Sequence, residues 1–162
     1  MKAYWMLLPA ALLASLAAAP AMAADDACQL TITGNDQMQF DKGELSVPAS
    51  CDEVTLTLKH SGEMDIETMG HNWVLTDTED YEDVAQEGMN AGLENDYLPQ
   101  GDDRIIAHTE VIGGGDSTSV TFSTEDLADR DLTFFCSFPG HYSIMKGSFN
   151  VTAENVEPAA TM

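Results

Sequence analysis

The sequence is poor in basic side chains. Only 6 Lys and Arg stand against 28 Asp and Glu, which gives a formal net charge of −22 at pH 7. A surface of this sign repels nucleic acid and anionic lipid, so we expect neither as a partner. The acidic residues are spread along the chain rather than gathered in one block. They could steer the protein toward a basic partner or keep it soluble in a salty medium, and we favour the second explanation.

The sequence also lacks a hydrophobic run long enough to predict a transmembrane helix. The longest run, Leu7 to Ala19, ends before Ala21-Met22-Ala23, the small-x-small pattern that signal peptidases cleave. Residues 1–23 are therefore predicted to be a secretory signal peptide, with an uncleaved anchor as the alternative. After cleavage we expect no membrane insertion. The exported protein would be one domain over residues 24–152, followed by a flexible tail at 153–162.

Cysteine is scarce, and its three positions are Cys28, Cys51 and Cys136. Disulfides persist in the oxidising compartments that exported proteins reach, and three thiols allow one bridge with one thiol left over. A bridge between Cys28 and Cys51 would close a loop of about two dozen residues and stabilise the fold by about 3 kcal/mol in the chain-entropy model. Cys136 would then be unpaired, and metal ligation is a common reason for an unpaired thiol in an exported protein.

Most of the chain after the signal peptide has the pattern of β-strands. Polar and apolar residues alternate at period two in four runs, and two further runs are denser in apolar residues, which is typical of central strands. The runs are 29–33, 54–58, 119–122, 148–152, 73–75 and 132–135. Turn signals such as Val47-Pro48 and Pro139-Gly140 separate them. This spacing predicts an all-β sandwich.

Residues 78–92 break the β pattern. Val84 and Met89 lie among acidic residues without alternation. The acidic side chains at 79–83 suit the N-terminal end of a helix because of the helix macrodipole. We therefore expect one short helix inserted between strands.

Metal-capable side chains gather in one short segment. Cys136 ends an apolar run, His141 follows the Pro139-Gly140 turn, and Met145 comes four residues later, while His71 begins another apolar run. Two imidazoles, a thiolate and a weak axial thioether are the donor set of blue-copper electron-transfer sites. Zinc sites rarely use a thioether. The sequence therefore predicts one copper ion that alternates between Cu(I) and Cu(II).

Longer motifs around these residues resemble the copper-site signatures of the azurins, a family of bacterial cupredoxins. The resemblance rests on Met69-Gly70-His71-Asn72-Trp73-Val74-Leu75 and on Cys136-x-Phe-Pro-Gly-His141-x-x-x-Met145-Lys146-Gly147, with Gly34 to Phe40, Asn90 to Leu93 and Ile105 to Thr109 in support. It extends from about Cys28 to Val151. It implies a Greek-key, cupredoxin-like β-sandwich with one external helix and a Cys28–Cys51 disulfide.

The resemblance also implies roles for individual residues. The metal ligands would be Gly70 (through its backbone carbonyl), His71, Cys136, His141 and Met145. Asn72 would tie the ligand loops together near Cys136, and the Phe138 amide would donate a hydrogen bond to the sulfur, which tunes the potential. Partner docking would involve an apolar patch of Met38, Met69, Phe138, Pro139 and Ile144 around His141, whose ring edge would reach the surface.

The implied function is electron transfer by a periplasmic monomer that is not itself an enzyme. Its partners would be redox proteins such as c-type cytochromes or a periplasmic reductase or dehydrogenase. A copper-buffering protein without a redox partner would use the same ligands and is the alternative. A copper oxidase or nitrite-reducing enzyme would need a second metal site with an open position. Only His60 and His108 remain as histidine ligands, and neither has a ligand-like spacing.

Overall fold

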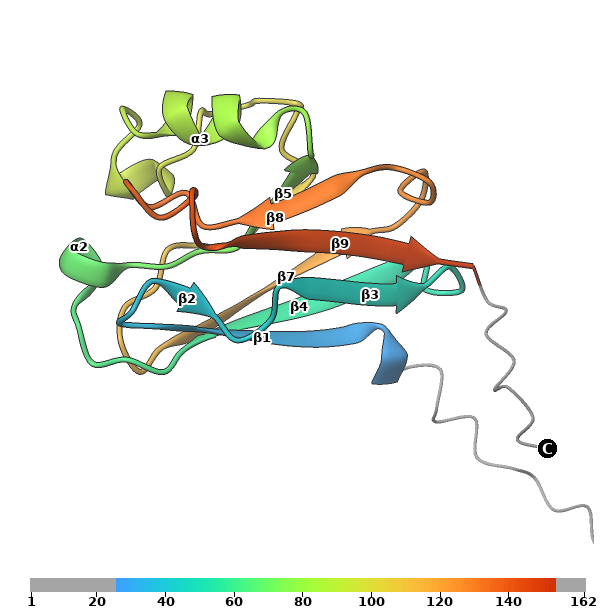
Figure 1. The fold of residues 1–162 in the computed structure, drawn as a ribbon, viewed down its shortest axis with the longest axis horizontal. Helices are drawn as coiled ribbons and strands as arrows, with labels where there is room; N and C mark the ends of the chain where they lie inside the picture. The colour runs from blue at the N-terminus through green and yellow to red at the C-terminus, as the bar shows by residue number, and fades with distance from the viewer. Residues whose placement is uncertain (1–25, 154–162) are drawn as a thin grey trace, which may run out of the picture.

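A computed structural model describes residues 26–153, which form two sheets packed face to face (Figure 1). The smaller sheet has the strand order β2-β1-β4-β7 and the larger one β3-β9-β8-β5-β6. The strands are β1 Gln29–Asn35, β2 Gln39–Phe40, β3 Glu44–Pro48, β4 Glu53–His60, β5 Val74–Asp77, β6 Ala107–His108, β7 Ser117–Ser123, β8 Leu132–Phe135 and β9 Lys146–Thr152. The expected all-β sandwich is confirmed. The expected signal peptide and nearly all of the expected tail lie outside the described residues.

Two of the strand pairs are parallel, β1 with β4 and β3 with β9, and the others are antiparallel. The six expected strands are all present, but β2, β3 and β6 were not expected. The expectation of a turn at Val47-Pro48 is wrong, because both residues belong to β3. This strand lies at the edge of its sheet, and Pro48 is its last residue, a position where the missing amide hydrogen is tolerated.

The space between the sheets is filled by the inward-facing side chains of the strands, which alternate with outward-facing ones. Val54, Leu56 and Leu58 of β4 are fully buried, and Trp73 lies against the rings of Phe122, Phe134 and Phe149. A buried side chain of this size contributes about 1.5–3 kcal/mol. This apolar layer gives the loops at each end of the sandwich a rigid base.

The expected helix is present but shorter than residues 78–92. It is α3, Tyr81–Gly88, which lies outside the larger sheet (Figure 1). Its buried residues Tyr81, Val84 and Ala85 pack with Val74 and Phe135 of that sheet. Two shorter helical segments, α2 (Ile66–Met69) and η1 (Leu93–Asn95), were not expected. Within residues 26–153, no helix has the length and apolar character that crossing a membrane requires.

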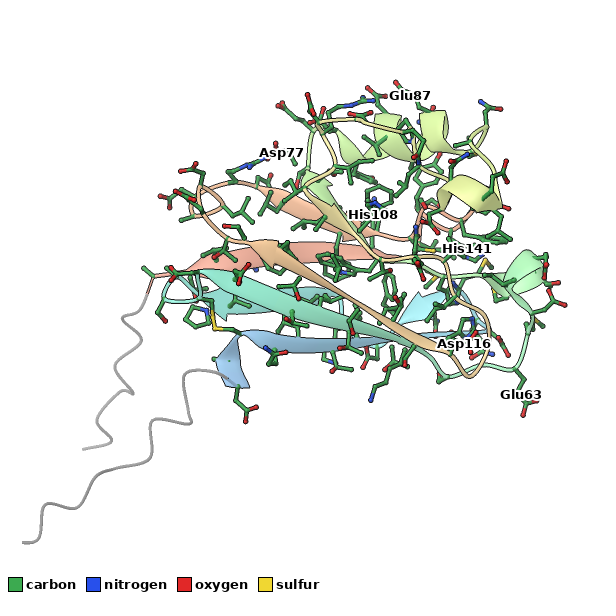
Figure 2. All side chains as sticks on the ribbon, turned by 180° about the vertical axis from the view of Figure 1, so that it is seen from behind. Glu63, Asp77, Glu87, His108, Asp116 and His141 are labelled. Carbon is green, nitrogen blue, oxygen red and sulfur yellow. A yellow bond between two sulfur atoms is a disulfide. The ribbon has the colours of Figure 1, made fainter. Side chains whose placement is uncertain are left out.

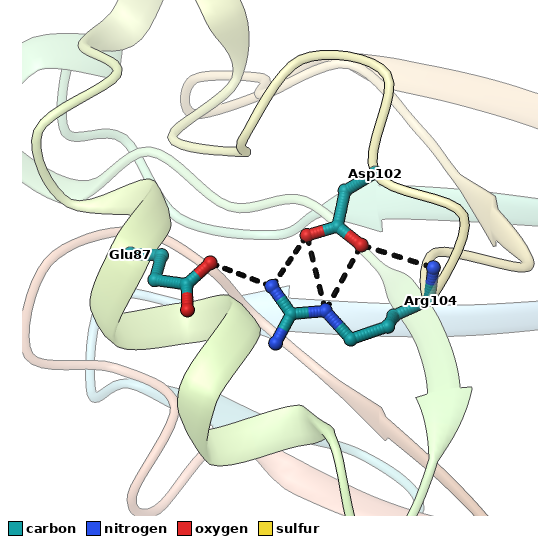
Figure 3. A network of polar contacts seen from close by, with 3 residues as sticks. All are labelled: Glu87, Asp102 and Arg104. Atoms are coloured by element: carbon teal, nitrogen blue, oxygen red, sulfur yellow. Dashed lines mark hydrogen bonds and ion pairs between the residues drawn. The ribbon is translucent and has the colours of Figure 1, made fainter.

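Arg104 attaches α3 to the loop that follows it (Figure 3). Its guanidinium bonds to Asp102 in its own loop and to Glu87 in the last turn of α3, with nitrogen–oxygen distances of 2.5 and 2.6 Å. The hydrogen bonds from Arg104 lower the pKa of the Asp102 carboxyl. Because these groups are partly exposed, solvent screening keeps the contribution of each pair to stability small. The helix is therefore held mainly by its buried apolar face.

The disulfide that the resemblance implied is present. Cys28 and Cys51 are bonded, with 5.7 Å between their Cα atoms, while Cys136 is free and buried. The bridge joins the start of β1 to the start of β4. Figure 2 shows it at the end of the sandwich opposite to His141.

Removing this bridge should lower stability without changing the fold. The two cysteines are 23 residues apart, so replacing both by alanine should reduce the free energy of unfolding by about 3 kcal/mol. Urea unfolding of the metal-free protein measures this loss, and circular dichroism should show an unchanged strand content. A loss below about 1 kcal/mol would contradict the entropic role of the bridge.

Candidate metal centre

One end of the sandwich gathers the expected metal-binding side chains. Cys136 directly follows β8 and Met145 directly precedes β9, so the antiparallel pairing of these strands brings them together. The Cys136 amide donates to the Met145 carbonyl at 3.0 Å, and the Met145 amide donates to the His141 carbonyl at 2.8 Å. Gly140 has a φ of 86°, a left-handed conformation that favours glycine in the turn before His141.

His71 reaches the same place from a different segment. An isolated β-bridge to Ile112 holds its backbone. The ring Nε2 donates to the Asn35 carbonyl at 2.8 Å, which leaves Nδ1 on the side of the Cys136 sulfur. Gly34 allows this approach, because a Cβ atom there would lie 2.7 Å from the His71 ring. The ring of His60 stacks on the ring of His71, with 4.3 Å between the ring centroids.

Three donor atoms come together in this way. The Cys136 sulfur lies 3.6 Å from Nδ1 of His141 and 3.9 Å from Nδ1 of His71, and all three side chains are buried. Met145 belongs to the same apolar cluster as Cys136 and is fully buried. Gly70 packs tightly beside them, because a Cβ atom there would lie within 3.0 Å of Ile66, Val111 and Phe138. Two imidazole nitrogens and one sulfur fit a soft transition-metal ion such as copper.

Burial sets the charge state of these donors. Desolvation raises the pKa of the Cys136 thiol to about 12, although the backbone amides of Asn72 and Phe138 hydrogen-bond to the sulfur and act in the opposite direction. Desolvation lowers the pKa of His141 to about 4, and it also lowers the pKa of His71. Both imidazoles are therefore neutral at pH 7, with lone pairs available. The thiol carries a proton, which a metal cation would displace.

A buried hydrogen-bond network connects the loops around the sulfur. The Asn72 Oδ1 accepts from the Ser137 amide at 2.8 Å, and the Asn72 side-chain amide donates to the Asp96 carbonyl at 3.1 Å. The Ser137 hydroxyl donates to the same carbonyl at 2.7 Å. Asp96 has a φ of 54°, and its carboxylate accepts from the Val111 amide at 2.8 Å. Sequence reasoning identified Asn72 but missed Ser137 and Asp96, because a backbone carbonyl acceptor leaves no signal in the sequence.

The residues expected to surround His141 differ in exposure. Pro139 and Ile144 are exposed, Met38 and Met69 are half-buried, and Phe138 is buried. The Phe138 ring packs on the His141 ring, with 4.7 Å between centroids. His141 is 3% exposed, whereas His71, Cys136 and Met145 are each 0% exposed. The two remaining histidines are not part of the donor group. His60 is buried and stacks on His71, and His108 is exposed.

Asn72 should be important for stability even without metal. Replacing it by alanine leaves the buried Ser137 amide and Asp96 carbonyl with fewer partners, which should cost about 3 kcal/mol. Asn150 provides a control of the same residue type, because its side chain bonds only to Glu44 on the surface. Asn150→Ala should change the free energy of unfolding by less than about 0.5 kcal/mol. Equal urea midpoints for the two metal-free variants would rule out this role of Asn72.

Comparison with known proteins agrees with this geometry. Residues 26–152 match the family model of copper binding proteins, plastocyanin/azurin family. The azurin of Bordetella pertussis is 52% identical over 134 residues, which are 82% of this chain and 88% of that protein. Azurin-1 of Alcaligenes xylosoxydans xylosoxydans is 52% identical over 121 residues, or 74% of this chain and 94% of that protein. A solved structure of azurin iso-2 from Methylomonas sp. strain J has a TM-score of 0.75 and 46% identity, covering 77% of this chain and 98% of that one. The resemblance is confirmed, and the chain belongs to the plastocyanin/azurin family of copper-binding proteins.

Proposed function

We propose that this protein is a periplasmic blue-copper carrier that transfers single electrons between redox proteins. The observation that supports this most strongly is the buried sulfur of Cys136, with imidazole nitrogens of His71 and His141 at 3.9 and 3.6 Å. When bound, copper supplies a one-electron couple between Cu(I) and Cu(II). This donor set is typical of sites that serve both oxidation states.

The three clustered side chains of His71, Cys136 and His141 would hold the ion. Met145 and the Gly70 carbonyl would be weaker ligands, and the thioether would favour Cu(I). Met145 packs with Cys136 in one buried cluster. Gly70 lies close to the donor group, because a Cβ atom there would be 3.0 Å from the Phe138 ring, which packs on His141. The hydrogen bond from His71 to Asn35 and the network of Asn72 would keep these groups in place in both oxidation states.

Electrons would enter and leave through His141. Of the four proposed side-chain ligands, His141 is 3% exposed and the other three are 0% exposed. Pro139 and Ile144 are exposed near it in the sequence. The expected partners are c-type cytochromes or a periplasmic reductase or dehydrogenase. The carrier itself would act as a monomer. Residues 1–23 would direct export to the periplasm.

Two other functions predict different behaviour. A copper-buffering protein would bind copper but would not exchange electrons rapidly. An enzyme such as a copper oxidase would need a second metal site with an open position. Within residues 26–153, the side chains of His71, Cys136 and His141 form the one group of three or more potential donors with a metal-binding spacing. This favours a single copper ion and a carrier.

Replacing Cys136 by serine tests the site directly. The oxidised, copper-loaded parent should be intensely blue, because charge passes from the thiolate to copper on light absorption. Cys136→Ser should lose this colour and keep its fold. A blue serine variant would show that another sulfur binds the metal. Stopped-flow mixing of the blue parent with reduced c-type cytochromes then separates the carrier from the buffer, since only a carrier is bleached rapidly.

Met145 should tune the site rather than create it. A long axial thioether bond is weak, and the potential of a blue-copper site depends on it and on the polarity near the sulfur. Met145→Leu should still bind copper and remain blue. Its reduction potential should rise, because Cu(II) loses more than Cu(I) when the axial donor is removed. Voltammetry of parent and variant measures the change, and a lowered potential or loss of copper binding would contradict this role.

A further inference from the structure

The end of the sandwich that carries His141 also carries a strongly acidic segment. Residues 61–69, which include α2, lie next to the metal centre, because Gly70 packs against both Ile66 of α2 and Phe138 beside His141. Figure 2 shows His141 and Glu63 at the same end of the molecule. Glu63, Asp65 and Glu67 are all exposed there. We call residues 61–69 the acidic arm.

The arm is held in a fixed conformation by its own hydrogen bonds. Asp36 accepts from the Glu63 amide at 2.8 Å, and Asp65 accepts from the Thr68 amide at 2.9 Å as the N-cap of α2. The Gly114 amide donates to the carbonyl of Met64 at 2.8 Å. The backbone of the arm and the Asp65 carboxylate are therefore held in place before any partner binds, which reduces the entropy that docking costs.

The few cations of the chain do not neutralise the arm. Lys42, Arg104 and Arg130 form ion pairs with acids elsewhere, and Lys146 hydrogen-bonds to Tyr81. Lys59, exposed in β4 two residues before the arm, forms no ion pair with the described residues. Among the described residues, no ion pair involves an acid of the arm. Its carboxylates therefore present their full charge at the end where the metal centre approaches the surface.

Exposed apolar side chains accompany these charges. Among residues 26–153, three large apolar side chains are clearly exposed, and two of them are at this end. Ile144 is 59% exposed and follows His141 closely, and Met64 is 43% exposed within the arm. Apolar contact beside unpaired charge of one sign is the composition of a surface that binds a partner of opposite charge.

We propose that the acidic arm and Ile144 form a docking surface for a soluble redox protein whose exposed cofactor edge is surrounded by Lys and Arg. This inference rests on the proposed function and specifies the chemistry of the partner. A second copy of this chain or an anionic membrane would be repelled by the same carboxylates. Screening at physiological salt limits strong charge effects to about 8 Å, so acids of the arm act on a docked partner while remote acids act mainly through net charge.

The chain offers a matched control at its other end. The loop between β7 and β8 lies away from α2 (Figure 1), and it contains exposed Glu125, Asp126 and Asp129. One variant carries Glu63→Gln, Asp65→Asn and Glu67→Gln, and the other carries Glu125→Gln, Asp126→Asn and Asp129→Asn. Each removes the same number of negative charges. Asparagine retains the capping ability of Asp65 and tolerates the positive φ of Asp126 and Asp129.

The first measurement is the rate of electron exchange between the copper-loaded protein and a basic c-type cytochrome with a lysine-ringed haem edge. At low salt, the arm variant should react about tenfold more slowly than the parent, and the control variant less than about twofold. The difference should disappear at high salt. Equal slowing of both variants would show that only net charge matters, and an unchanged arm variant would also overturn the proposal.

The second measurement reports binding without electron transfer. The Cu(I) protein, labelled with ¹⁵N, is titrated with the reduced cytochrome, and amide shifts should cluster in residues 61–69 and 138–144. The Kd of the arm variant should be about tenfold weaker than that of the control variant. Shifts centred elsewhere would overturn the docking surface. If the parent exchanges electrons with neither the cytochrome nor hexacyanoferrate, the proposed function fails, and the shift map still decides the docking surface separately.

Discussion

The sulfur of Cys136 is completely buried, and this burial raises the pKa of its thiol to about 12. The same desolvation keeps His71 and His141 neutral. Bringing three such groups out of water costs free energy, because they have few hydrogen-bond partners apart from one another. The apolar layer between the sheets and the Cys28–Cys51 bridge must offset that cost. As a result, the donor atoms of His71, Cys136 and His141 lie within 4.8 Å of one another without a metal ion.

The loops around this centre lack regular secondary structure, so their positions depend on particular side chains. Asn72 and Ser137 meet at the carbonyl of Asp96, and three segments far apart in the sequence are joined there. Buried networks of this kind are rigid when every member is paired. The Asn35 carbonyl fixes the tautomer of His71 in a similar way. Orientation of the donors is therefore a property of their neighbours.

Much of this could be predicted from the sequence, for physical reasons. Alternation at period two reveals strands such as β4 because one face is buried and the other is not. The segment from Cys136 to Met145 is informative because its donors are close in the chain. Short elements escaped prediction, since α2 has four residues and β2 and β6 have two each. The position of Asp96 was also beyond reach, because its left-handed backbone and its carbonyl contacts arise only in the folded chain.

The shortage of cations shapes the surface as well. On the outer face of the smaller sheet, neighbouring strands are linked by neutral hydroxyl pairs, Thr55 with Thr121 and Thr57 with Ser119. Acidic residues directly opposite each other at these positions would repel, and too few basic residues exist to pair with them. Two of the cations join segments distant in sequence, Arg130 with Asp77 and Lys146 with Tyr81. A strongly acidic chain can thus form a close-packed sandwich by using neutral hydroxyl pairs between neighbouring strands.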